Sequence, residues 1–238
     1  MVNRTQPPED FPARTVDVRF TGRVDLDVPV DLRPVCFNGK DITHRLWELA
    51  GAFDGSRLTV SRLTVGTEHG QVEAIKLKVC HDVLLALPMQ RWLYSVDDGQ
   101  AWVHVIENVE FYLREEYRGQ GIGRISLLTE ALAANDLLFD KIIAIAAGSP
   151  QDQRHVGWKV WPKLGYDAVI AKDILDRMPP HRLSRAGIDP TSEVRISDLL
   201  DQGLYDLWVT HGEGCIMELD VRSLSTWSMQ RLADFDEE

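Results

Sequence analysis

EFYLREEYRGQGIGRISLLTEALAA, from Glu110 to Ala134, places three glycines at alternate positions, Gly119, Gly121 and Gly123. The residues before the glycines have a strand-like composition, and those after them repeat apolar side chains at helical spacing. The first N–H groups of a helix lack intrahelical partners, and the helix dipole makes that end electropositive. Because glycine has no side chain, an anion can approach these groups closely, so the stretch predicts a diphosphate site.

The register of the glycines excludes two familiar phosphate loops. A Walker loop ends in Gly-Lys-Ser/Thr, and no such tripeptide follows here. A dinucleotide fingerprint, G-x-G-x-x-G, would need its third glycine at position 124, which is Arg124, and no acid is placed to bind a ribose. The motif that remains is RGQGIG, Arg118 to Gly123, with an arginine on each side of the glycines.

Hydrophobic patterns predict alternating strands and helices around this turn. Strands are expected at 15–20, 72–87, 91–98, 101–115, 141–148, 166–171 and 215–221. Helices are expected at 41–53, 121–135, 152–164 and 223–235, and a short one within 193–212. The apolar run KIIAIAAG at 141–148 is typical of a buried, parallel strand. Pro162 should end or bend its helix early. We expect one α/β (α+β) domain over 15–238, a flexible tail over 1–14, and an insertion or connector over 172–215.

Composition limits the class of function. The formal charge of −11 argues against a nucleic-acid partner and slightly favours a cationic one. No apolar run approaches the ~20 residues of a membrane span, so no membrane partner is expected. Three widely spaced cysteines form neither a disulfide framework nor a metal motif, which predicts a cytoplasmic protein without a metal. A monomer or a homodimer is expected.

RGQGIG resembles the pyrophosphate-binding motif [QR]-x-x-G-x-[GA] of the GNAT superfamily of acyl-CoA-dependent N-acyltransferases. Arg118, Gly121 and Gly123 match its defined positions, and KLGYDAV, Lys163 to Val169, is similar to a second segment of that family. The close resemblance covers about residues 102–170. It implies a GNAT fold, a mixed central sheet splayed at the acyl-CoA site, flanked by helices and followed here by a C-terminal extension. It also implies acetyl-CoA as co-substrate.

The resemblance further implies which residues bind this co-substrate. In the family, the strand before the glycines lines the pantetheine arm, which maps here to Phe111, Tyr112 and Leu113. A strand amide would stabilise the oxyanion of the tetrahedral intermediate. The pyrophosphate would be held by the amides of Arg118, Gly119, Gln120, Gly121, Ile122, Gly123 and Arg124.

A carboxylate on the same strand is a common base in the family, because the attacking amine must be neutral. Glu107 is the first candidate, since an ideal strand puts it on the same face as Phe111 and Leu113. Glu110 points to the other face, although a bulge would reverse this parity. His104 is a third candidate. The alternative for Glu107 is a solvated charge at a strand edge.

The family often protonates the leaving thiolate with a tyrosine on the later helix, and this chain has Trp161 at that position. An indole is a donor only and cannot replace a phenol as an acid. Tyr166, Tyr112 or His155 would have to substitute, or the CoA thiolate leaves without a dedicated acid.

The resemblance therefore implies an N-acetyltransferase that transfers an acetyl group to an amine of a small molecule or protein, by direct attack in a ternary complex. An alternative is a catalytically inactive acyl-CoA-binding sensor or interaction module. A third hypothesis is an α/β interaction protein that binds no CoA.

Overall fold

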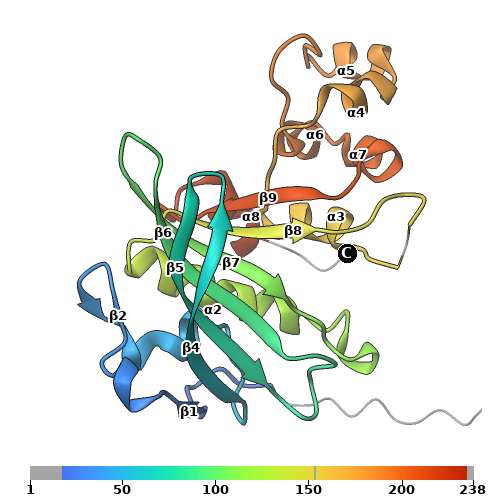
Figure 1. Ribbon diagram of the computed structural model, residues 1–238. Helices are drawn as coiled ribbons and strands as arrows, with labels where there is room; N and C mark the ends of the chain where they lie inside the picture. Colours follow the sequence, from blue (N-terminus) through green and yellow to red (C-terminus); the bar gives the residue numbers. More distant parts are fainter. Residues whose placement is uncertain (1–17, 153, 235–238) are drawn as a thin grey trace, which may run out of the picture.

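The computed structural model describes residues 18–152 and 154–234, so the expected tail over 1–14 lies outside the described residues. Seven strands form one mixed sheet in the order β1-β4-β5-β6-β7-β8-β9, and β2 pairs with β3 in a separate hairpin. Figure 1 shows helices around this sheet, in agreement with the expected α/β class. The strands are β1 (Asp25–Asp27), β2 (Cys36–Phe37), β3 (Lys40–Asp41), β4 (Arg57–Thr67), β5 (Gly70–Cys80), β6 (Met89–Asp97), β7 (Trp102–Glu110), β8 (Lys141–Ala146) and β9 (Cys215–Asp220).

The sheet combines an antiparallel meander with two parallel pairs, β1–β4 at one edge and β7–β8 further in. Strands β4 to β7 are antiparallel neighbours, β7 and β8 are parallel, and β9 returns antiparallel to β8. A parallel neighbour requires a crossover, and helix α2 (Ile122–Asp136) supplies it between β7 and β8. The strand expected at 166–171 is reduced to isolated bridges, one of which joins Asp167 to Glu218 of β9. The strand expected at 15–20 is absent from its described part, residues 18–20.

The helices vary greatly in length. They are α1 (Leu46–Leu49), α2 (Ile122–Asp136), α3 (Gly157–Val160), α4 (Lys172–Arg177), α5 (Pro180–Arg185), α6 (Ile196–Asp201), α7 (Tyr205–His211) and α8 (Trp227–Ala233). The helix expected at 121–135 is confirmed as α2. The helix expected at 152–164 begins later and becomes a 3-10 turn at Trp161, because Pro162 has no N–H to continue an α-helix. Gly165 ends it with φ +89°.

The segment expected as an insertion or connector is mostly helical. It carries α4 to α7, each of six or seven residues. The helix expected within 193–212 is confirmed, as the two helices α6 and α7, whereas α4 and α5 are too short for an apolar period to reveal them in the sequence. Figure 1 shows these four helices grouped at one end of the molecule, beside the start of β9. The insertion therefore extends the sheet domain at the end where β8 finishes.

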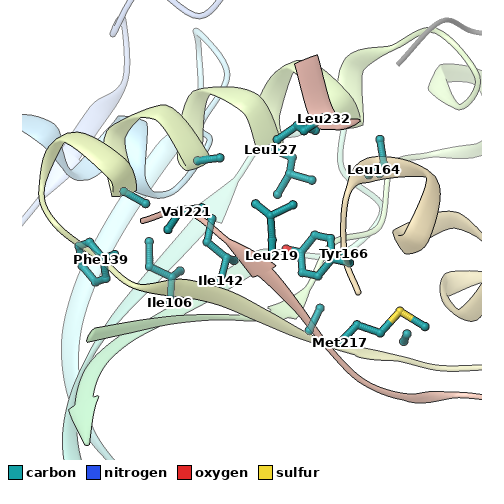
Figure 2. Packing of buried hydrophobic residues seen from close by; sticks show 14 of the residues in the cluster. Ile106, Leu127, Phe139, Ile142, Leu164, Tyr166, Met217, Leu219, Val221 and Leu232 are labelled. Atoms are coloured by element: carbon teal, nitrogen blue, oxygen red, sulfur yellow. The ribbon is translucent and has the colours of Figure 1, made fainter. Parts of the chain in front are cut away.

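The main core lies between the sheet and helices α2 and α8. Figure 2 shows Ile142 of β8 and Leu219 of β9 meeting Leu127 of α2 and Leu232 of α8. The opposite face of β8 is only partly covered, since Ile143 packs against a second apolar cluster whereas Ile145 is 68% exposed. The apolar run at 141–148 is thus a strand parallel to β7 that is fully buried on one face only. No helix of the described chain is both long enough and apolar enough to span a bilayer.

Candidate functional site

Strand β7 leaves its neighbours just after Asn108. The parallel pairing with β8 ends where Asn108 faces Ala144. On the other side of β7, the register with β6 shifts between Asn108 and Glu110, so Val109 has no partner on β6 and forms a β-bulge. A bulge bends its strand, and β7 and β8 diverge from this point.

Beyond the bulge, residues 111–113 run beside residues 84–86 instead of β8. The N–H of Ala86 donates to the carbonyl of Tyr112 at 2.9 Å, and the N–H of Arg114 donates to the carbonyl of Leu84 at 2.9 Å. Backbone groups alternate sides along an extended chain, so the N–H of Leu113 points the other way, toward β8. It has no acceptor among the described residues. An extended ligand could pair with this edge.

A cavity of about 300 Å³ opens where β7 and β8 diverge. Aromatic and aliphatic side chains line it together with two arginines and one histidine, and no Asp or Glu of the described chain is among its walls. It is lined by Asn108, Val109, Phe111, Tyr112, Leu113, Arg118, Gly123, Ile145, Ala147, Arg154, His155, Val156, Gly157, Val160, Trp161 and Leu164. In a protein of formal charge −11, a cavity without carboxylates favours an anionic or neutral ligand.

The glycine turn, which meets the cavity at Arg118 and Gly123, carries a run of unpaired amides. Gly119 and Gly121 adopt positive φ values of +68° and +71°, which glycine tolerates without steric cost. The N–H groups of residues 119 to 124 have no acceptor among the described residues, and the next one, Ile125, returns to the carbonyl of Gly121 at 3.0 Å. Six successive free donors at the electropositive start of a 15-residue helix can bind an anion.

The side chains around the turn have different roles. The guanidinium of Arg118 lines the cavity, donates through Nε to the carbonyl of Leu113 at 3.0 Å, and has no ion pair within the described chain. Arg124 instead donates to the carbonyls of Leu232 and Ala233 at the end of α8, so only its amide faces the turn. The side chain of Ile122 is in the core. That of Gln120 donates to the carbonyl of Glu116.

The predicted base Glu107 lies next to the cavity, directly before its lining residue Asn108, but is not itself part of the wall. It pairs with Trp92 of β6 and Ile143 of β8, one residue before β7 and β8 part. Its Oε2 accepts a hydrogen bond of 3.1 Å from the Tyr94 hydroxyl. Burial raises the pKa of the Glu107 carboxyl, and the bond from Tyr94 opposes this only in part. A carboxyl with a raised pKa is suited to accept a proton near neutral pH.

The bulge moves the side chain of Glu110 to the sheet face opposite to the one expected for an ideal strand. Its carboxylate accepts from the side chain of Gln90 at 2.6 Å, and Gln90 shares a sheet face with Trp92 and therefore with Glu107. The same shift separates Phe111 and Leu113 from the face of Glu107, contrary to the ideal-strand expectation. His104, the third candidate, lies near the other end of β7, where its Nδ1 is 2.8 Å from Ser95 Oγ.

The tyrosine predicted for catalysis does not reach the cavity. Tyr166 is fully buried, and its hydroxyl accepts a hydrogen bond of 2.9 Å from Asn108 Nδ2. Burial raises the pKa of this phenol well above its ordinary value, so it is a poor proton donor to a thiolate. Trp161 lines the cavity in its place, with its ring centroid 4.9 Å from that of Tyr166. Tyr112 and His155, the other two residues considered as substitutes for the missing tyrosine, both line the cavity.

A buried polar cluster beneath the bulge was missed by sequence reasoning. Arg91 of β6 and Glu130 of α2 form an ion pair with Nε to Oε2 at 3.2 Å, and both side chains are fully buried. Asn108 donates to the same Oε2 at 3.3 Å and links it to Tyr166. The one sign of this cluster in the sequence is a charged residue at an otherwise apolar position of each element. That Arg91 pairs with Glu130 could not be decided without knowing the fold.

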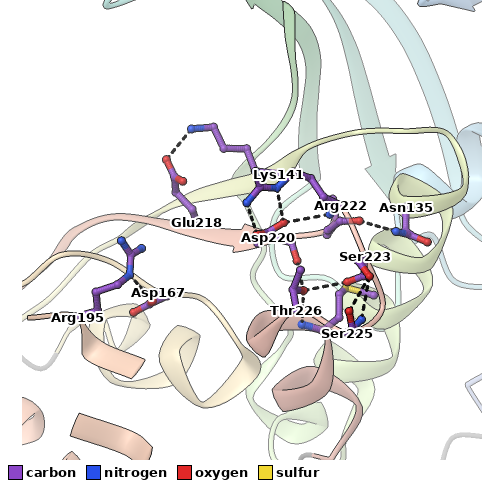
Figure 3. A network of polar contacts seen from close by, with 12 residues as sticks. Asn135, Lys141, Asp167, Arg195, Glu218, Asp220, Arg222, Ser223, Ser225 and Thr226 are labelled. Atoms are coloured by element: carbon purple, nitrogen blue, oxygen red, sulfur yellow. Dashed lines mark hydrogen bonds and ion pairs between the residues drawn. The ribbon is translucent and has the colours of Figure 1, made fainter. Parts of the chain in front are cut away.

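Two other cavities show no comparable arrangement. One of about 530 Å³ lies between the β2–β3 hairpin and strands β4 to β6. Another of about 480 Å³ lies beside the polar network of Figure 3, in which Lys141 pairs with Glu218 and Arg222 with Asp220, both at 2.6 Å. Because these charges neutralise one another, we interpret this network as structural. Within residues 18–152 and 154–234, no group of three His, Cys, Asp or Glu side chains could hold a metal ion.

Comparison of this chain with protein-family models, with curated proteins and with solved structures finds no match. The functional assignment therefore depends on the site itself.

Proposed function

We propose that this protein is an N-acetyltransferase of the GNAT type, which uses acetyl-CoA. The observation that carries the proposal is the run of six unpaired amides from Gly119 to Arg124 beside a cavity free of carboxylates. The diphosphate of the co-substrate would bind these amides, with Arg118 as a counter-charge. The pantetheine arm would enter between β7 and β8, where the free N–H of Leu113 can pair with one of its amide carbonyls.

The sheet order supports the same proposal. The antiparallel meander, the parallel β7–β8 pair that diverges after Asn108, and the return of β9 agree with the splayed mixed sheet that the sequence resemblance implies. The bulge at Val109 supplies the physical cause of the divergence.

In this proposal the acceptor amine attacks the thioester carbonyl carbon from the face that carries Glu107. The C–N bond forms, the C–S bond breaks, and CoA leaves as its thiolate. Glu107 takes the proton of the amine, directly or through a water, and the raised pKa of its half-buried carboxyl fits this role. The thiolate is itself a tolerable leaving group, which makes a tyrosine acid dispensable.

The test is CoA release from acetyl-CoA across a panel of amines, followed with a thiol reagent. We expect Glu107→Gln to lower kcat/KM by about 10²–10⁴-fold. Glu218→Gln is the matched control, because this carboxylate lies one strand away opposite Ile143 and is already neutralised by Lys141. Equal rates for the native protein and Glu107→Gln would exclude Glu107 as the base.

The acid limb of the pH profile provides a second check. Because Glu107 must be deprotonated to act, kcat/KM should fall as the pH drops through its raised pKa, above the ordinary value of 4.5. An acid limb that persists unchanged in Glu107→Gln would assign it to another group.

A second candidate function is an acyl-CoA-binding module without catalysis. Trp161 on the cavity wall and the burial of Tyr166 favour it, since neither offers a phenol to the thiolate. Binding of acetyl-CoA with no CoA release for any amine would support the module over the enzyme.

A further inference from the structure

Arg91 and Glu130 form an ion pair that is completely removed from solvent. Both side chains have zero exposure, and Nε of Arg91 lies 3.2 Å from Oε2 of Glu130. Removing two charges from water costs more than such a pair usually returns, and apolar residues of similar volume often replace it without loss of stability. Stability therefore does not explain the pair, and its contacts must be considered.

The guanidinium of Arg91 binds the backbone at the register shift. Its Nη1 donates to the carbonyl of Gln90 at 3.1 Å and to the carbonyl of Glu110 at 3.2 Å. These two residues are the first pair beyond the bulge. Its Cζ also lies 5.4 Å from the ring centroid of Phe111, within the range of a cation–π contact. Arg91 thus fixes the chain on the far side of Val109.

Glu130 fixes the near side of the same bulge. Its Oε2 accepts from Asn108 Nδ2 at 3.3 Å, and that amide also donates to the Tyr166 hydroxyl at 2.9 Å. A single carboxylate on α2 therefore connects to the chain before and after Val109. Because α2 is the helix that begins at the glycine turn, the pair joins the turn to the point where β7 and β8 diverge.

We propose that Arg91 and Glu130 are positioning residues for the pantetheine arm of the co-substrate. This rests on the proposed function. Neither side chain lines the cavity, so the pair acts through Phe111 and the backbone of 110–113. It holds the bulge in the one geometry that leaves the backbone N–H of Leu113 unpaired and pointing toward β8.

The role requires the shape of arginine as well as its charge. The planar guanidinium contacts Glu130 through Nε and the two carbonyls through Nη1 simultaneously. A lysine ammonium is a single point charge on a flexible stem and cannot span these acceptors in the same way. Arg91→Lys should therefore retain a buried ion pair while releasing the bulge.

The experiment measures affinity by calorimetry for two probes, acetyl-CoA and 3′-phospho-ADP, which carries the diphosphate without the pantetheine arm. The variants are Arg91→Met/Glu130→Leu, which removes both charges, and Arg91→Lys. Arg45→Met is the matched control, because Arg45 forms an ion pair with Glu48 on α1 and does not line the cavity.

We expect both variants of the buried pair to lose at least tenfold in affinity for acetyl-CoA and less than twofold for 3′-phospho-ADP, with the affinity of Arg45→Met unchanged for both probes. A purely structural role would weaken the two probes equally, and that result would overturn the proposal. So would native affinity for acetyl-CoA in either variant. If the double variant does not fold, the affinities of Arg91→Lys for the two probes decide the outcome alone. If the native protein binds neither probe, the proposed function fails, and this inference fails with it.

Discussion

Two glycines of the turn are required by backbone conformation, and the third is not. Gly119 and Gly121 have φ values of +68° and +71°, where a side chain is strained. Gly123 does not have a positive φ, and a Cβ there would lie 3.6 Å from the Phe111 ring, an ordinary contact. The three glycines are therefore not equivalent, although they look alike in the sequence.

Alanine at two of these positions should change stability in opposite directions. Gly121→Ala should lower the free energy of unfolding by about 1–2 kcal/mol, because alanine resists the left-handed region. Gly123→Ala should raise it by about 0.4–1 kcal/mol, because alanine restricts the unfolded chain and suits a helix. Urea unfolding of the two variants measures both effects. Two losses of equal size would contradict the conformations described for this turn.

Glu107 should make a pH-dependent contribution to stability. Burial raises its folded-state pKa above the ordinary value of 4.5, so between these two pKa values the folded state binds more protons than the unfolded state. The native protein should therefore lose stability relative to Glu107→Gln as pH rises from 4 through the folded pKa, and Glu107→Gln should be the more stable protein at pH 7. Urea unfolding at pH 4 and 7 tests this. A difference that does not change with pH would mean that the carboxyl is fully solvated.

At the scale of elements, α7 of the insertion stabilises the wall of the cavity. Helix α3 has only four residues and could not persist alone. Trp208 of α7 donates from Nε1 to the carbonyl of Trp158 at 2.7 Å, and the Tyr205 hydroxyl donates to the carbonyl of Lys159. The insertion thus supplies donors to carbonyls of α3, and it connects a distant segment to the candidate site.

Removing the indole N–H of Trp208 should weaken this connection. Trp208→Phe deletes the hydrogen bond and leaves a small cavity in a buried position, so the free energy of unfolding should fall by about 2–3 kcal/mol. The control is Trp102→Phe, which changes a side chain that is 64% exposed and should cost less than about 0.5 kcal/mol. Similar losses in the two variants, measured by urea unfolding, would show that α7 does not support α3.

At the scale of the whole molecule, the parts that could be predicted are those governed by local sequence. The turn from β7 into α2 and the apolar β8 depend on residues close in the chain, and both are confirmed. The bulge at Val109 depends on how β6 pairs with β7, and the ion pair joins residues 39 positions apart, Arg91 and Glu130. Neither leaves a local pattern. This is why an ideal strand places Glu107 and Phe111 on the same face, whereas the bulge places them on opposite faces.

The central claim is that the glycine turn and the cavity beside it bind the diphosphate and pantetheine arm of acetyl-CoA. Calorimetric titration of the native protein with acetyl-CoA, in parallel with S-acetylpantetheine, tests it most directly. The claim predicts one site per chain and at least tenfold weaker binding of S-acetylpantetheine, which lacks the diphosphate that the amides of Gly119 to Arg124 would hold. No binding of acetyl-CoA, or equal affinity for the two compounds, would contradict it.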